Sequence, residues 1–175
     1  FFHIGSVFLI YVIFDKQSLN SSLRSEYKLY SKRLALIVAS IFAVHPAISE
    51  AVVWISGGMY PQYTFFFLLS FLLYLLSKKD IKIYFAKQNS PTVYWASVLA
   101  FLGTFMSHPQ MPLALFIIFP VWELSFGNLK KDWKKSLPFL VITIFYLLVT
   151  LSGLQERETT LQTVHYQERG SDNPF

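Results

Sequence analysis

Long apolar stretches separated by short polar segments restrict this chain more than any other feature of its sequence. An α-helix needs about 20 predominantly apolar residues to cross a membrane, with a range of about 17–25. Six apolar runs approach or reach that length, at 1–14, 34–55, 61–77, 92–107, 111–127 and 137–152. We therefore predict an all-α fold, a polytopic transmembrane helical bundle with about six spans.

The lysines and arginines alternate with these runs. Thirteen of the fifteen basic residues fall in every second loop, at 15–33, 78–91 and 123–136. The intervening segments 45–62 and 107–112 contain none. Cytoplasmic loops of membrane proteins carry an excess of basic residues, so we place these three loops inside. Residue 1 and the C-terminal tail are then expected on the outer or luminal side of a bacterial inner membrane or the endoplasmic reticulum.

Composition favours a membrane protein over a soluble one. Only 14% of the residues are charged and 54% are hydrophobic, whereas soluble domains carry about 25% charged residues. The net charge of +5 is confined to short clusters between apolar runs, so we expect membrane lipid and not nucleic acid as the partner. The chain has no cysteine and does not begin with methionine, and we expect it to be an internal part of a longer protein.

The first outer segment begins at His45 and contains unusual residues for a loop between spans. Pro46 would break a helix that arrives from the preceding run, and Ser49 can cap a new helix. Gly57-Gly58 would end it, so we predict a short interfacial helix on the outer face. Glu50 lies at the membrane boundary, where an ionisable group is either part of a functional site or a charge that stabilises a helix N-terminus.

The second outer segment is Ser107-His108-Pro109-Gln110-Met111-Pro112. His108 and Gln110 carry donors that can hold a phosphate or a sugar hydroxyl, and the two prolines make the backbone irregular at membrane level. The alternative is an ordinary turn between two helices with an interfacial histidine. No two of the four histidines have the spacing of metal ligands, so we expect no metal site.

Aromatic residues near the ends of the runs have a simpler interpretation. Tryptophan and tyrosine rings suit the headgroup layer of a bilayer, so we expect these residues to anchor the spans. They are Trp54, Trp95, Trp122, Trp133, Tyr60, Tyr63 and Tyr94. We expect Phe65-Phe66-Phe67 to face lipid or a neighbouring helix, and Glu123 to be an ordinary boundary charge.

One stretch resembles a known family. Residues 42–57 read F-A-V-H-P-A-I-S-E-A-V-V-W-I-S-G. This is similar to a motif of the transmembrane-and-tetratricopeptide-repeat O-mannosyltransferases and their bacterial relatives, within the GT-C glycosyltransferases. The aromatic span 65–74, the turn 106–109 and Asp172-Asn173-Pro174 also match the family pattern in position. Gly58-Met59-Tyr60 departs from it, because relatives often have a basic residue followed by Asp there.

The resemblance implies an inverting membrane glycosyltransferase. Such an enzyme moves a sugar, with mannose as one candidate, from a polyprenyl- or dolichyl-phosphate donor to a protein or glycan acceptor on the outer face. Residues 1–175 would form part of a single GT-C-like transmembrane domain, with further N-terminal spans and any C-terminal repeats lying outside it. The catalytic Asp is then expected upstream of Phe1. The residues implied in donor or substrate binding are His45, Glu50, Trp54, His108, Gln110, Asp172 and Asn173.

Two other classes of protein remain open from the sequence. A transporter or flippase needs polar groups at mid-membrane positions, and the spans hold little beyond Ser40, Ser70, Thr104 and Thr143. A non-catalytic membrane scaffold is the other alternative, because no catalytic Asp is identified within residues 1–175.

Overall fold

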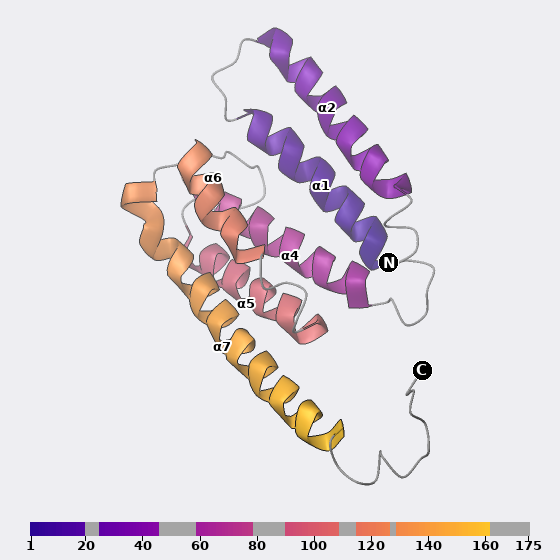
Figure 1. The fold of residues 1–175 in the computed structure, drawn as a ribbon. Helices are drawn as coiled ribbons and strands as arrows, with labels where there is room; N and C mark the ends of the chain where they lie inside the picture. The colour runs from indigo at the N-terminus through magenta and orange to yellow at the C-terminus, as the bar shows by residue number, and fades with distance from the viewer. Residues whose placement is uncertain (20–24, 46–58, 79–89, 109–114, 127–128, 162–175) are drawn as a thin grey trace.

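The computed structural model describes residues 1–19, 25–45, 59–78, 90–108, 115–126 and 129–161 (Figure 1). These residues form helices and no strand, which confirms the all-α prediction for this part of the chain. The helices are α1 (Phe2–Leu19), α2 (Ser25–Val44), α4 (Met59–Leu76), α5 (Pro91–Ser107), α6 (Ile118–Phe126) and α7 (Leu129–Leu161). The predicted interfacial helix falls in residues 46–58, outside the described residues.

The boundaries of α5 follow from its sequence. Ser90 has an extended backbone and Pro91 occupies the first turn of the helix, where a missing N–H costs nothing. The helix ends at His108, which is also extended, with φ −156° and ψ 108°, and whose N–H donates to the carbonyl of Thr104. A residue that precedes a proline is biased away from helical geometry, and Pro109 comes next in the sequence.

Successive helices run in opposite directions, so their ends form two groups. In the first group of helix ends, the Phe2 ring of α1 contacts Phe65 of α4, and the His3 ring stacks on Phe42 of α2. His108 at the end of α5 stacks on Tyr60 at the start of α4. We call this group the histidine end, and the N-terminus lies there (Figure 1).

The opposite group contains the end of α4 and the beginning of α7. Lys78, just after α4, pairs with Glu123 of α6 and Asp132 of α7. Tyr94, in the first turn of α5, donates to the backbone carbonyl of Lys135 in α7. We call this group the basic end, because the described lysines and arginines before Gly153 all lie in the half of their helix, or just after it, on this side.

Aromatic rings form the core between α4, α5, α6 and α7. Phe119 and Phe139 are fully buried and stack with centroids 4.0 Å apart and an interplanar angle of 15°. Phe101 and Tyr74 meet both rings edge-on. Such pairs contribute about 0.5–1.5 kcal/mol each beyond burial of their area, so this cluster orients all four helices.

Small residues let α4 and α5 approach closely. The hydroxyl of Ser70 donates to the carbonyl of Ser97, and the hydroxyl of Ser97 donates to the carbonyl of Ser70, each at 2.8 Å. A Cβ on Gly103 would lie 3.2 Å from the ring of Phe66, so the ring packs directly on the helix backbone. Small residues and interhelical hydroxyl bonds are the usual means of helix association in membranes.

The phenylalanine run at the start of α4 is packing surface. Phe65 lies against α1, where a Cβ on Gly5 would come within 2.7 Å of its ring. Phe67 is buried in the aromatic core. Of the two alternatives for this run, the contacts of these rings favour helix packing over lipid contact.

Two helical segments are long and apolar enough to cross a membrane, Met59–Leu76 and Asp132–Gly153. α5 has 17 residues and α6 has 9. At 1.5 Å per residue these correspond to about 26 Å and about 14 Å, against a hydrocarbon thickness of about 30 Å. The described residues therefore support two candidate spans, and the six-span topology stays a prediction.

Candidate functional site

His108 is held between tyrosines at the histidine end. Its ring stacks on Tyr60, with centroids 5.7 Å apart and an interplanar angle of 23°. Tyr63 meets the same ring edge-on, with a centroid distance of 6.1 Å and an angle of 66°. All three side chains are half-buried. The contact joins the first turn of α4 to the end of α5, so the position of the imidazole depends on both helices.

His3 and His45 lie at the same end on the neighbouring pair of helices. The Nε2 of His3 is 3.2 Å from the carbonyl oxygen of Ala43, and its ring stacks on Phe42 at 5.6 Å and 27°. This contact ties the start of α1 to the end of α2. His45 follows the last residue of α2 and is exposed, so two of the predicted site residues, His45 and His108, share one end of the molecule.

The remaining predicted site residues lie outside the described residues. They are Glu50, Trp54, Gln110, Asp172 and Asn173. Their roles stay predictions from the sequence.

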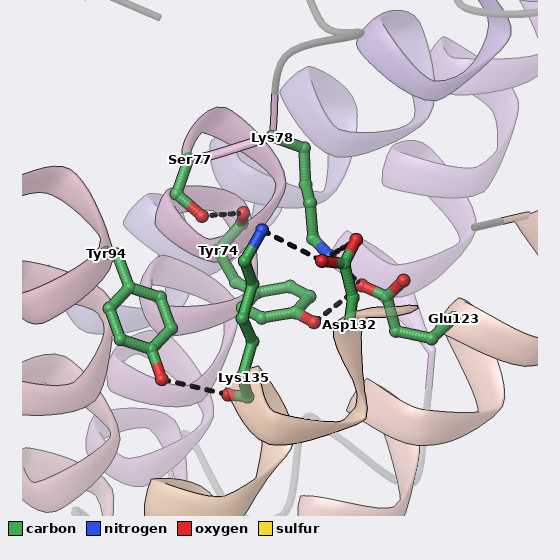
Figure 2. A network of polar contacts seen from close by, with 7 residues as sticks. All are labelled: Tyr74, Ser77, Lys78, Tyr94, Glu123, Asp132 and Lys135. Atoms are coloured by element: carbon green, nitrogen blue, oxygen red, sulfur yellow. Dashed lines mark hydrogen bonds and ion pairs between the residues drawn. The ribbon is translucent and has the colours of Figure 1, made fainter. Parts of the chain in front are cut away.

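A buried ion-pair network lies at the basic end (Figure 2). The ammonium group of Lys78 pairs with Glu123, and its Nζ also lies 3.0 Å from Oδ2 of Asp132. The hydroxyl of Tyr74 donates to Oε1 of Glu123 at 2.5 Å. Lys135 pairs with the other oxygen of Asp132 at 3.0 Å. Two ammonium groups therefore balance two carboxylates contributed by α6 and α7.

Burial makes this network costly to disturb. Lys78 is 7% exposed and Glu123 is 1% exposed, so both charges have lost most of their hydration. Removing one member of a buried pair costs about 3–5 kcal/mol, because the other charge is left uncompensated. Asp132 is better solvated and sits in the first turn of α7, where a negative charge also favours the helix.

The expectation that Glu123 is an ordinary boundary charge was wrong. Glu123 does lie at a helix end, but its side chain is buried and paired across helices with Lys78. The charge alternation placed both residues on one side of the membrane, and that was the only signal in the sequence that they could meet. Their separation of 45 positions along the chain gives no local indication of the pairing.

The other half of the network joins α5 to α7. The hydroxyl of Tyr94 donates to the carbonyl of Lys135 at 3.0 Å, and Ser77 donates to the carbonyl of Tyr74 at 2.7 Å. Every charge of the network has an opposite charge as its partner, so the arrangement is suited to holding helices together. Within the described residues, no group of His, Asp or Glu side chains has the arrangement of a metal site.

The tryptophans separate into two kinds. Trp95 and Trp133 are 58% and 48% exposed, as expected for rings that anchor helices in a headgroup layer. Trp122 is 7% exposed and belongs to the aromatic core, so its expected anchoring role was wrong. Trp122 is part of α6 and contacts α4, where its ring meets that of Tyr74 edge-on.

No protein-family model, curated protein or solved structure matches this chain. Its function has to be inferred from the two ends of the helices. One end presents histidine and tyrosine side chains, and the other holds paired charges.

Proposed function

We propose that this chain is part of a multi-pass membrane glycosyltransferase of the GT-C type. It moves a sugar from a polyprenyl-phosphate donor to a protein or glycan acceptor on the outer face of the membrane. The observation that carries the proposal is the separation of His45 and His108 from the charged network of Lys78 and Glu123, at opposite ends of apolar helices. An enzyme that uses a lipid-linked donor needs its polar groups at one membrane surface.

The exposed surface of the helices supports placement in a bilayer. Large apolar side chains cover the outside of α7, where Val141, Phe145 and Leu148 are each about 60% exposed. α2 presents a similar face with Leu36 and Ile41. Contiguous apolar surface of this kind is rare on soluble monomers and marks contact with membrane or another protein.

The chemistry of the histidine end suits a phosphate-containing donor. In sugar transfer with inversion, an acceptor hydroxyl attacks the anomeric carbon, the bond from that carbon to the phosphate oxygen breaks, and a base takes the hydroxyl proton. Negative charge grows on the departing phosphate, and a positioned N–H donor stabilises it. We assign that donor role to His108, and the resemblance adds His45 and Glu50 of the 42–57 motif as further donor-binding residues. The resemblance implies an Asp as this base, and we assign the role to none of residues 1–175.

Substitution of the assigned residues tests the proposal. In the full-length protein we expect Glu50→Gln and His108→Ala each to reduce transfer from a polyprenyl-phosphate sugar, while membrane insertion is unchanged. Lys134→Ala is the matched control, because Lys134 is exposed at the basic end, and it should transfer sugar at the wild-type rate. Unchanged transfer in both site variants would overturn the assignment.

A transporter or flippase is the principal competing function. Two of the polar side chains within the described helices already have partners, since the hydroxyl of Ser70 bonds to the carbonyl of Ser97 and that of Thr143 to the carbonyl of Phe139 in its own helix. Few groups are left to bind a solute at mid-membrane, which favours the enzyme. Substrate flux into proteoliposomes without glycosyl transfer would favour the transporter. A wild-type protein that shows neither glycosyl transfer nor solute flux would favour the non-catalytic scaffold.

A further inference from the structure

The two tyrosines beside His108 come from one face of α4. Tyr60 and Tyr63 are three positions apart, a spacing that places side chains next to each other on a helix. Their rings meet edge-on with centroids 6.1 Å apart and an interplanar angle of 72°. His108 contacts both rings, one by its face and one by an edge. The three rings form a closed set of pairwise contacts.

His108 lies at the very end of its own helix. It is the C-cap of α5, where the backbone has left helical geometry, and the following residue is a proline. A side chain at such a position would sample several rotamers without neighbours, and a ligand that used it would have to order it. The stack on Tyr60 and the edge contact of Tyr63 restrict the plane of the imidazole before any ligand binds.

We propose that Tyr60 and Tyr63 are positioning residues that hold the imidazole of His108 for the phosphate group of a polyprenyl-phosphate donor. This inference rests on the proposed function and extends it to two residues that the sequence assigned to membrane anchoring. Tyr60 provides the larger restraint, because its face covers the imidazole, and Tyr63 limits rotation of the ring about its last bond. The tyrosines act through His108 and do not contact the reacting atoms.

Two substitutions at Tyr60 separate the ring from its hydroxyl. Tyr60→Phe keeps the aromatic face, and Tyr60→Leu keeps an apolar side chain but removes the stack. Aromatic stacks have energies that correspond to about a two- to tenfold change in an equilibrium constant. We expect Tyr60→Leu to raise KM for the donor by about that factor with kcat changed less than about twofold, and Tyr60→Phe to behave as the wild type.

A ring pair elsewhere provides the matched control. Tyr146 of α7 stacks on Phe105 with centroids 4.8 Å apart and an angle of 19°, so Tyr146→Leu removes a comparable stack that does not involve His108. We expect this variant to leave KM for the donor unchanged. An equal rise in KM in both leucine variants would show a general packing effect and overturn the positioning role.

Nuclear magnetic resonance of the full-length protein with labelled histidine tests the inference without turnover. The ring current of Tyr60 should displace the His108 ring-proton signal, which is assigned by its loss in His108→Asn. The signal should move in Tyr60→Leu, stay in Tyr60→Phe and Tyr146→Leu, and respond to added polyprenyl phosphate with weaker affinity in Tyr60→Leu. A signal that does not move in Tyr60→Leu, or does not respond to the lipid phosphate, overturns the inference. A normal response in a protein that transfers no sugar supports the positioning role and rejects the glycosyltransferase.

Discussion

Lys78 and Glu123 form a buried ion pair between the end of α4 and the short helix α6. The pair lies at the basic end, and Tyr74 and Asp132 complete its polar surroundings (Figure 2). The ion pair joins α4 to α6 next to the core residues Tyr74 and Trp122. The consequences for stability can be tested residue by residue.

Removal of the shared ammonium group should be the most damaging change at the basic end. Lys78→Met leaves Glu123 buried without its counter-charge, and we expect the free energy of unfolding to fall by about 3–5 kcal/mol. Titration with a denaturing detergent in bicelles measures this value. Lys134→Met, at an exposed position, should change it by less than about 0.5 kcal/mol. Pairing Lys78→Met with Glu123→Leu should restore part of the loss, and no recovery would argue against the ion pair as the cause.

The hydroxyl of Tyr74 should matter separately from its ring. Tyr74→Phe keeps the edge contacts with Phe119 and Phe139 but removes the bond to the Glu123 carboxylate. Hydrogen bonds to charged groups contribute about 1.5–3 kcal/mol, so we expect a loss of that size in the same titration. Tyr30→Phe, at a residue that is 66% exposed, is the control and should be neutral.

The reciprocal bonds between Ser70 and Ser97 should show measurable coupling. Single Ser→Ala changes at each position, together with the double change, form a double-mutant cycle. Interhelical hydrogen bonds in membranes average about 0.6 kcal/mol, with a maximum of about 1.7 kcal/mol. We expect a coupling energy in that range, and a value of zero would show that the two hydroxyls do not support each other.

The stacked pair Phe119 and Phe139 should be the centre of the core. Phe139→Ala removes a fully buried ring, and we expect a loss of about 3–5 kcal/mol in the free energy of unfolding. Phe145→Ala is the matched control six positions later on the same helix, where the ring is 59% exposed. Equal losses in the two variants would contradict the position of the core.

The absence of cysteine from the chain allows a direct test of topology. Single cysteines introduced as His45→Cys and Lys134→Cys lie at the histidine end and the basic end, and both positions are exposed. A thiol reagent that does not cross membranes should label the first from outside in intact cells and the second only after permeabilisation. Labelling of both from the same side would overturn the proposed orientation.

Local sequence was sufficient for the helices and for the grouping of their ends. Apolar runs predicted where helices form, since a helix satisfies its own backbone bonds. The predicted run 92–107 agrees to within one residue with α5, Pro91–Ser107. The alternation of basic segments put Lys78 and Lys135 on the same side and His45 with His108 on the other, because each span reverses the direction of the chain.

Only the tertiary structure decided which side chains meet. The rotation and tilt of each helix select the contacts, and these depend on how rings such as Phe119 and Phe139 fill the space between neighbours, which no local pattern specifies. The same packing turned Glu123 of α6 inward to Lys78. It also brought Tyr60 and Tyr63 to His108. The length of the apolar runs therefore determined where the helices form, and the alternation of basic segments determined which helix ends lie together. Packing of the aromatic rings determined which side chains meet between the helices.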